Sequence, residues 1–260
     1  MELYESIVLE WLAQHYWPFV RVSSMLLTMA VFSGRGIPAR IKIMFAMVIS
    51  IAIAPAIPPV QVPFDTVSPA GMLVTVQQII IGVALGFLSL LAINTFALAG
   101  QVLGMQIGLG FAAMVDPSSG QQVPVVAQFY LMLATLIFLA LDGHLLMIHM
   151  VAASFDMMPI GQRGLDADAF FYIASWAVWM FNAALGFALS AMISILLINL
   201  SFGVMTRASP QLNIFTVGFP ITMISGLLIL WLTVGNFVVH FENQWQRAIS
   251  GMCFILGGNC

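Results

Sequence analysis

The sequence predicts an all-α integral membrane protein with about six long apolar helices in hairpins, some kinked and projecting beyond the bilayer. Of its 260 residues, 62% are hydrophobic and 7% are charged, and the mean hydropathy is +1.06. Soluble proteins contain about 25% charged residues, because a chain folded in water needs a polar exterior. Lipid or partner subunits must therefore cover much of the apolar surface of this chain.

Six apolar runs approach or exceed the roughly 20 residues that a membrane helix needs. They cover residues 16–33, 43–60, 72–99, 123–141, 169–206 and 212–241. A further apolar stretch, Leu145 to Phe155, is too short to span the bilayer. It either lies along an interface or continues the fourth helix after a break at Asp142-Gly143.

Two of these runs are longer than a bilayer requires. As helices, runs 72–99 and 169–206 would measure about 42 and about 57 Å, against a hydrocarbon core of about 30 Å. The fifth run must therefore kink, break or project beyond the lipid, and Asn182, Gly186 and Asn199 are the candidate weak points.

The distribution of charge predicts the orientation, because cytoplasmic loops collect Lys and Arg. The first loop contains Arg35, Arg40 and Lys42, and alternation of the runs places Arg207 on the same side. The aspartates fall on the opposite side: Asp65, Asp142, Asp156, Asp166 and Asp168. Both termini are therefore expected in the periplasm.

The ends of the chain carry two further signals. Glu2, Glu5 and Glu10 occupy the region that would be basic in a cleavable signal peptide, so we expect insertion through the chain's own helices. Cys253 and Cys260 fit no zinc or redox motif at their spacing, and we expect two incidental thiols without a role.

Composition and motifs argue against nucleic-acid binding and catalysis. The formal net charge is −3, and the seven basic residues are scattered rather than gathered in a patch. Asp142, His144 and His149 lie near one helix end, but the two histidines are five residues apart, about 140° around a helix, which is poor spacing for one metal. No nucleotide-binding, metalloprotease or nucleophile motif is present, so we expect no enzyme activity and no cofactor.

Glycine recurs every four residues at Gly100, Gly104 and Gly108, which predicts a small-residue stripe where apolar helices pack closely. Beyond it, Gly110 and Pro117 disfavour a regular helix. One interpretation is a packed helix followed by an ordinary connecting loop, and the other is a flexible apolar stopper.

Two polar features interrupt the apolar background. Arg21 lies near the start of the first run, where it either faces a partner subunit or an internal cavity, or snorkels to the interface. Arg207, Gln211 and Asn213 form the tip of the last hairpin, for which a solvated turn is the simplest interpretation.

Three separated segments carry a family resemblance. They are Arg207 to Phe215 with the following Gly218-Phe219-Pro220, Arg21 to Lys42, and Gly104 to Gln122. Together they resemble the FliR/SctT family, whose flagellar member, FliR, belongs to the type III secretion export gate. The resemblance implies a FliP-like part over residues 1–165 and a FliQ-like helical hairpin over 166–260, with a cytoplasmic tip at about 206–213 and a periplasmic tail.

The same resemblance implies a function in flagellum biogenesis. A FliR-like chain is a non-enzymatic subunit of the inner-membrane export gate at the flagellar basal body. It forms with FliP and FliQ the FliPQR complex, which passes unfolded flagellar proteins and works with FlhA and FlhB.

Site residues also follow from the resemblance. The matching loop, about 104–122, plugs the pore, which assigns Gly108, Gly110, Phe111 and Met114 to the plug. Bulky, soft side chains on a glycine-hinged segment suit a displaceable apolar stopper. The resemblance places the tip residues Arg207, Gln211 and Asn213 near FlhB, where Arg207 could pair with an acidic group or a lipid phosphate.

Two alternatives to the flagellar function stay open at this point. The first is the homologous subunit of a virulence injectisome, which shares the gate fold. The second, from a different class, is a small-solute transporter, in which polar groups near the bilayer midplane bind the substrate. Few buried charges and no symmetry between the halves argue against the transporter, and a membrane-embedded enzyme ranks below both.

Overall fold

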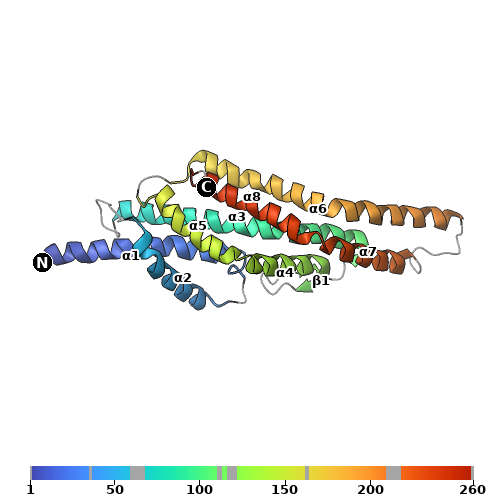
Figure 1. Ribbon diagram of the computed structural model, residues 1–260, viewed down its shortest axis with the longest axis horizontal. Coiled ribbons are helices and arrows are strands. Elements are labelled where there is room, and N and C mark those ends of the chain that lie inside the picture. Colours follow the sequence, from blue (N-terminus) through green and yellow to red (C-terminus); the bar gives the residue numbers. More distant parts are fainter. Residues whose placement is uncertain are drawn as a thin grey trace. The chain divides into compact units, whose positions relative to one another are not determined.

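The computed structural model describes residues 2–34, 37–58, 68–109, 113–115, 122–161, 164–208 and 218–258. These residues form helices connected by short breaks and one small strand pair (Figure 1). The helices are α1 (Glu2–Thr28), α2 (Ala39–Ile53), the short 3-10 helix η1 (Ala54–Ala56), α3 (Pro69–Ile107), α4 (Val125–Ala140), α5 (Gly143–Met157), α6 (Ala167–Ala208), α7 (Phe219–Val234) and α8 (Phe237–Ile255). The predicted all-α class is confirmed.

The two longest helices begin at capping residues. Ser68 precedes α3, and its hydroxyl accepts a hydrogen bond from the Gly71 N–H at 3.1 Å. Asp166 precedes α6, and its carboxylate accepts one from the Ala169 N–H at 3.0 Å. Each cap satisfies one of the amide groups that the first turn leaves without an intrahelical partner.

α6 is one unbroken helix of 42 residues, or about 63 Å at 1.5 Å per residue. Figure 1 shows it as a single continuous coil. Of the three alternatives for the fifth run, a kink, a break or projection beyond the lipid, the break is excluded, because the helix continues through Asn182, Gly186 and Asn199. Helix propensity of the long apolar segments between these residues outweighs their small individual costs.

The short apolar stretch after the fourth run forms α5, which is separated from α4 by Asp142 in the left-handed region at φ 53°. The predicted break at Asp142-Gly143 is confirmed. In the described residues, three helical segments are long and apolar enough to cross a membrane. They are α2 together with η1 (39–56), α3 (69–107) and α6 (167–208). The number rises to five if each bent pair, α4 with α5 and α7 with α8, counts as one span.

Contacts divide the chain into two compact units. The first contains Met1–Leu91, Phe138–Ala177 and Gln246–Cys260, and the second contains Ala92–Ile137 and Val178–Trp245. Each unit combines segments that are distant in sequence, so neither is a continuous stretch of the chain.

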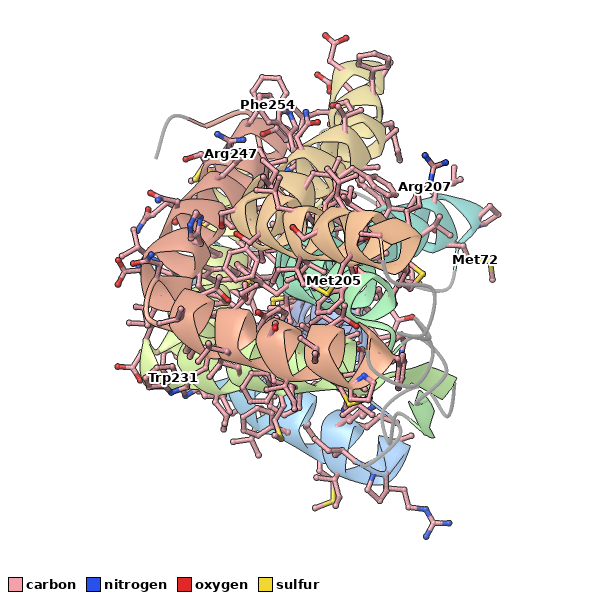
Figure 2. All side chains as sticks on the ribbon, turned by 90° about the vertical axis from the view of Figure 1, so that its right-hand side faces the viewer. Met72, Met205, Arg207, Trp231, Arg247 and Phe254 are labelled. Atoms are coloured by element: carbon pink, nitrogen blue, oxygen red, sulfur yellow. The ribbon has the colours of Figure 1, made fainter. Side chains whose placement is uncertain are left out.

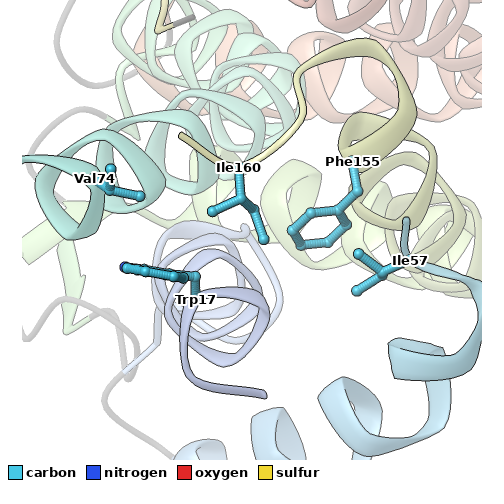
Figure 3. Packing of buried hydrophobic residues seen from close by; sticks show 5 residues of the cluster. All are labelled: Trp17, Ile57, Val74, Phe155 and Ile160. Carbon is cyan, nitrogen blue, oxygen red and sulfur yellow. The ribbon is translucent and has the colours of Figure 1, made fainter. Parts of the chain in front are cut away.

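The first unit has an apolar centre contributed by α1, α3, α5 and their connections. Its buried side chains are Trp17, Ile57, Val74, Phe155 and Ile160, which converge in Figure 3. The Trp17 indole N–H donates to the Thr75 hydroxyl at 3.2 Å, so the polar edge of this ring is satisfied.

The second unit is centred on aromatic rings from α3, α4, α6 and α8. Phe96 packs against Phe187, Phe237 and Phe241 at centroid distances of 5.7, 4.7 and 5.7 Å. Tyr130 joins the same cluster at 5.5 Å from Phe187. Nearby, the Gln244 amide donates to the Thr95 hydroxyl at 3.2 Å, which keeps a buried polar group paired.

One expectation about the C-terminal end is wrong. Cys253 is buried and disulfide-bonded, so it is not an incidental thiol. Cys260 lies outside the described residues.

Candidate functional site

The predicted plug segment connects α3 to α4 in the second unit. α3 ends at Ile107, and Gly108 follows with φ 88° and its N–H donating to the Met105 carbonyl at 3.2 Å. This left-handed conformation is readily adopted only by glycine. Gly108 therefore sets the point and the direction in which the chain leaves the helix.

Beyond Gly108 the segment is partly described. Gly110 and Phe111 lie outside the described residues, whereas Met114 lies in the strand β1 (Ala113–Val115). β1 pairs antiparallel with β2 (Gln122–Pro124), and Met114 stands opposite Val123. The outgoing and returning parts of the segment are thus joined by backbone pairing before α4 begins.

Glycines let α3 and α4 approach closely where the segment leaves and returns. A Cβ on Gly100 would lie 2.6 Å from the Ala127 Cα, inside the distance that real side chains allow. A Cβ on Gly104 would meet Pro124 and Val126 at 3.4 and 3.5 Å, which is ordinary contact. The backbones of α3 and α4 are therefore nearly in contact at Gly100 and slightly further apart at Gly104.

α7 holds the end of α3 from a second direction. The Phe219 ring lies 2.8 Å from an ideal Cβ on Gly108, and Ile107 would be 2.6 Å from one on Gly226. Leu103 and Ile107 are fully buried. We call the packed ends of α3, α4 and α7 the neck, defined by Gly100, Ile107, Gly108, Ala127 and Gly226.

The predicted glycine stripe is therefore shorter on the helix than the spacing suggested. Gly100 and Gly104 lie on α3, but Gly108 lies just beyond its end and contacts Phe219 instead of α4. Gly108 keeps the four-residue spacing of the sequence pattern, but its left-handed conformation ends the helix, so it is not part of the helical stripe.

Chemically, the neck offers packing rather than reactivity. The residues that form it are apolar or glycine, and they can hold a connecting segment firmly at its base. Within the described ranges, no group of three or more His, Cys, Asp or Glu side chains could hold a metal ion.

The predicted tip lies at the end of α6. Arg207 is in the last turn of that helix and is exposed, and Figure 2 shows it projecting away from the ribbon. A cation there complements the negative end of the helix dipole. Gln211 and Asn213 lie outside the described residues.

Arg21 lies in the interior of the first unit and is completely buried. Its Nε donates to Gln78 Oε1 at 2.7 Å, and its Nη1 to the carbonyl and hydroxyl oxygens of Ser154 at 2.9 and 3.0 Å. Its Nη2 donates to the Met158 carbonyl at 2.9 Å, and the guanidinium lies 4.2 Å from the centroid of the Phe155 ring. Each of these acceptors is neutral.

This burial contradicts two of the three interpretations of Arg21 and leaves the one in which the side chain is directed into the interior. The side chain does not snorkel to an interface, and it does not face a partner subunit, because its own chain encloses it. Its partners Gln78 and Ser154 are about 60 and 130 residues away in the sequence. No local pattern could have identified them.

A second set of close contacts was missed at the sequence level. A Cβ on Gly82 would meet the Ser24 hydroxyl and the Arg21 carbonyl, and a Cβ on Gly86 would meet the Thr28 hydroxyl and the Met25 carbonyl, all at 2.5 Å or less. Small residues thus face each other at four-residue spacing on α1 and α3. That spacing, read on both segments together, is the signal that would have found this seam.

The comparisons with known proteins cover nearly the whole chain. Residues 12–248 match the family described as bacterial export proteins, family 1. The chain is 40% identical over 249 residues to the flagellar biosynthetic protein FliR of Pectobacterium carotovorum, covering 96% of this chain and 95% of the relative. It is 39% identical to FliR of Escherichia coli, covering 85% and 84%, and 27% identical to FliR of Bacillus subtilis, covering 90% and 91%. Matches of this extent show that the chain belongs to bacterial export proteins, family 1, the family of the flagellar biosynthetic proteins FliR.

Proposed function

We propose that this chain is a non-enzymatic subunit of the flagellar type III protein export gate. With FliP and FliQ it forms the channel that passes unfolded flagellar proteins across the bacterial inner membrane. FlhA and FlhB are its further partners in the export apparatus. In this proposal, residues 1–165 form the FliP-like part of the chain and residues 166–260 form the FliQ-like hairpin.

The observation that carries the proposal is the uncovered apolar surface of α6. Only 28% of its most apolar window is buried, although the helix is about 63 Å long and a bilayer core about 30 Å thick. Lipid can cover about half of such a helix. Apolar side chains stay exposed along its whole length, among them Phe171, Leu185, Leu196 and Val204. Partner subunits are the natural cover for the remainder.

The plug belongs to the same proposal. A channel for unfolded chains must exclude water and ions at rest and yield to a passing polypeptide. The segment between Gly108 and Pro124 suits this task, since its base is fixed in the neck while Phe111 and Met114 supply apolar bulk. Displacement of the segment would leave the neck intact.

Orientation completes the proposal. Arg207, Gln211 and Asn213 face the cytoplasm and contact FlhB, and both termini lie in the periplasm. Arg35, Arg40 and Lys42 then lie on the cytoplasmic side with Arg207, as the distribution of basic residues requires.

The test is assembly. The tagged chain is co-expressed with FliP and FliQ, purified in mild detergent, and the intact complex is weighed by native mass spectrometry. We expect one discrete mixed complex, because the apolar face of α6 needs these partners. As a control, the same preparation without FliP and FliQ should give an aggregating chain. A stable monomer or homo-oligomer that ignores both partners would contradict the proposal and favour a transporter.

A further inference from the structure

α7 and α8 present opposite kinds of surface, although only a short break separates them. The exposed side chains of α7 are apolar, with Ile224, Leu228 and Trp231 at 68, 57 and 72% exposure. In α8, every exposed side chain from residue 240 to residue 250 is polar or charged. We call this set the polar face of α8: His240, Glu242, Asn243, Gln246, Arg247 and Ser250. The character of the surface therefore changes at the break, where the chain bends by 60°.

The apolar face of α8 is not available to lipid. Phe237, Phe241 and Trp245 are 1, 1 and 5% exposed, and the Phe96 ring of α3 packs against the first two. An amphipathic helix that lies in a membrane interface does the reverse, because it buries its apolar face among the acyl chains. α8 instead presents its polar face to the surroundings, and acyl chains would leave these groups without hydrogen-bond partners.

The part of the second unit that precedes the break fits a bilayer in length. The Phe187 ring of α6 lies 5.5 Å from that of Phe237 and 5.2 Å from that of His240 between centroids, so the start of α8 is level with Phe187. From Phe187 to Ala208, α6 rises about 32 Å, and the hydrocarbon core of a bilayer is about 30 Å thick. This part of α6 has no charged residue before Arg207, and the chain returns along α7.

We propose that the break at Gly235 and Asn236 marks the edge of the lipid. Acyl chains cover the exposed side chains of α7, and the polar face of α8 lies in water. Trp231 suits this edge, because it is exposed one turn before the end of α7 and tryptophan is enriched at membrane–water interfaces.

The same edge divides α6. Val178, Phe181 and Leu185 precede Phe187 and so lie beyond the edge, although they are exposed and apolar. Partner subunits are left to cover them there. This cover and the periplasmic side of α8 rest on the proposed function, whereas the edge itself follows from the change of surface between α7 and α8.

Labelling with a water-soluble maleimide tests both sides of the edge. Both native cysteines are replaced with serine, and Leu228→Cys or Asn243→Cys is introduced into the full chain, which is expressed with FliP and FliQ. In membranes opened to the reagent on both sides, we expect Asn243→Cys to react severalfold faster than Leu228→Cys, with the cysteine-free parent as the blank. Equal rates, or protection of Asn243→Cys in the complex, would overturn the proposal.

A photocrosslinking residue distinguishes lipid from protein as the cover of α7. Benzoylphenylalanine in place of Leu228 should give no adduct with another protein chain, because acyl chains surround this position. The same residue in place of Leu185 should give such an adduct, since partner subunits cover that part of α6. A protein adduct at Leu228 would overturn lipid as the cover of α7. An adduct missing only at Leu185 supports lipid at Leu228 and contradicts the proposed assembly.

An added charge tests the edge without labelling. Leu228→Arg places a cation among acyl chains, so we expect the amount of assembled chain in the membrane to fall severalfold. Asn243→Arg adds the same side chain in water and should leave that amount unchanged. Equal amounts of the two variants would mean that the break is not the edge of the lipid.

The side of the membrane is measured separately. In intact spheroplasts, Asn243→Cys should react without permeabilisation, because the proposed orientation places α8 on the periplasmic side. Reaction only after permeabilisation would contradict that orientation and would still place the polar face of α8 in water.

Discussion

Arg21 shows how this fold keeps a charge in an apolar interior. Removing an ion from water costs several kcal/mol even after relaxation. Here the cost is offset by hydrogen bonds to Gln78, Ser154 and Met158 and by the Phe155 ring. Because these acceptors belong to α3 and to the end of α5, one side chain on α1 ties three parts of the first unit together.

Replacing Arg21 should destabilise the protein strongly. Arg21→Met removes the donors and leaves several buried acceptors unpaired, so we expect a loss of about 3 kcal/mol or more. The thermal unfolding midpoint of the purified complex measures this loss. Arg40→Met, at an exposed arginine of α2, is the matched control and should change stability little. Similar midpoints for the two variants would show that the hydrogen bonds of Arg21 contribute nothing.

The seam between α1 and α3 makes a second prediction for single residues. Gly82→Ala places a methyl group against the Ser24 hydroxyl and the Arg21 carbonyl, and the carbonyl belongs to the backbone and cannot rotate away. We expect a destabilisation of about 1–3 kcal/mol, since overpacking separates the helices. Gly186→Ala, where no described atom lies within 4 Å, should change the stability of the purified complex little. Denaturant or heat titrations of both variants would decide.

At the scale of elements, the connection between α3 and α4 has a base that is fixed by close packing. Gly100 lets the helices approach at the base, and Gly108 turns the chain out of α3. Met114 lies beyond these points, in the short strand pair. A force on the segment would thus act on a base that resists separation.

Two alanine variants distinguish the exit point from the rest of the base. Gly108→Ala is strained at φ 88° and presses on the Phe219 ring, whereas Gly104→Ala adds a methyl group at ordinary contact distance from Pro124. We expect Gly108→Ala to misplace the segment, raise ion leakage through the assembled complex and reduce flagellar export severalfold. Gly104→Ala should resemble the parent protein. Conductance in planar bilayers and swimming assays measure both effects, and equal leakage from the two variants would contradict a special role for Gly108.

At the scale of the whole molecule, the length of α6 predicts that part of it lies outside the lipid. Phe171 and Val204 are 33 positions apart, or about 50 Å along the helix, whereas the bilayer core is about 30 Å thick. In a background without native cysteines, single cysteines replace Phe171, Leu189 and Val204. A water-soluble maleimide applied to permeabilised membranes of the isolated chain should label at least one end position and spare Leu189→Cys. Equal protection of all three positions would contradict projection beyond the lipid.

The sequence predicted the membrane class and the positions of most helices, because an apolar run of about 20 residues is typical of a membrane-spanning helix. It could not predict that α6 is continuous through Asn182 and Gly186, since each costs a fraction of a kcal/mol to about 1 kcal/mol in a helix that long. It identified the break at Asp142, where Gly143 follows and the run loses its apolar pattern.

Distant partners were beyond reach from one sequence. Arg21 is conspicuous in its run, yet the acceptors that bury it lie in α3 and α5 and show no local sign of this role. Cys253 was misjudged as well, because nothing in its local sequence indicates that it is disulfide-bonded. The sequence analysis assigned Gly108 both to the helical glycine stripe and to the segment that follows the helix. Only its backbone angle, φ 88°, shows that it lies beyond the end of the helix.

The seam of Gly82 and Gly86 against α1 has an electrical consequence. These helices meet with backbone and hydroxyl atoms so close that a methyl group does not fit, so a hydrated ion cannot pass between them. A bacterial membrane sustains a voltage across a few nanometres, and each elementary charge that crosses 100 mV dissipates about 2.3 kcal/mol. In the proposed export gate, a subunit must be insulating along its own joints as well as at the proposed plug, and the close approach of α1 and α3 at these glycines would provide that insulation.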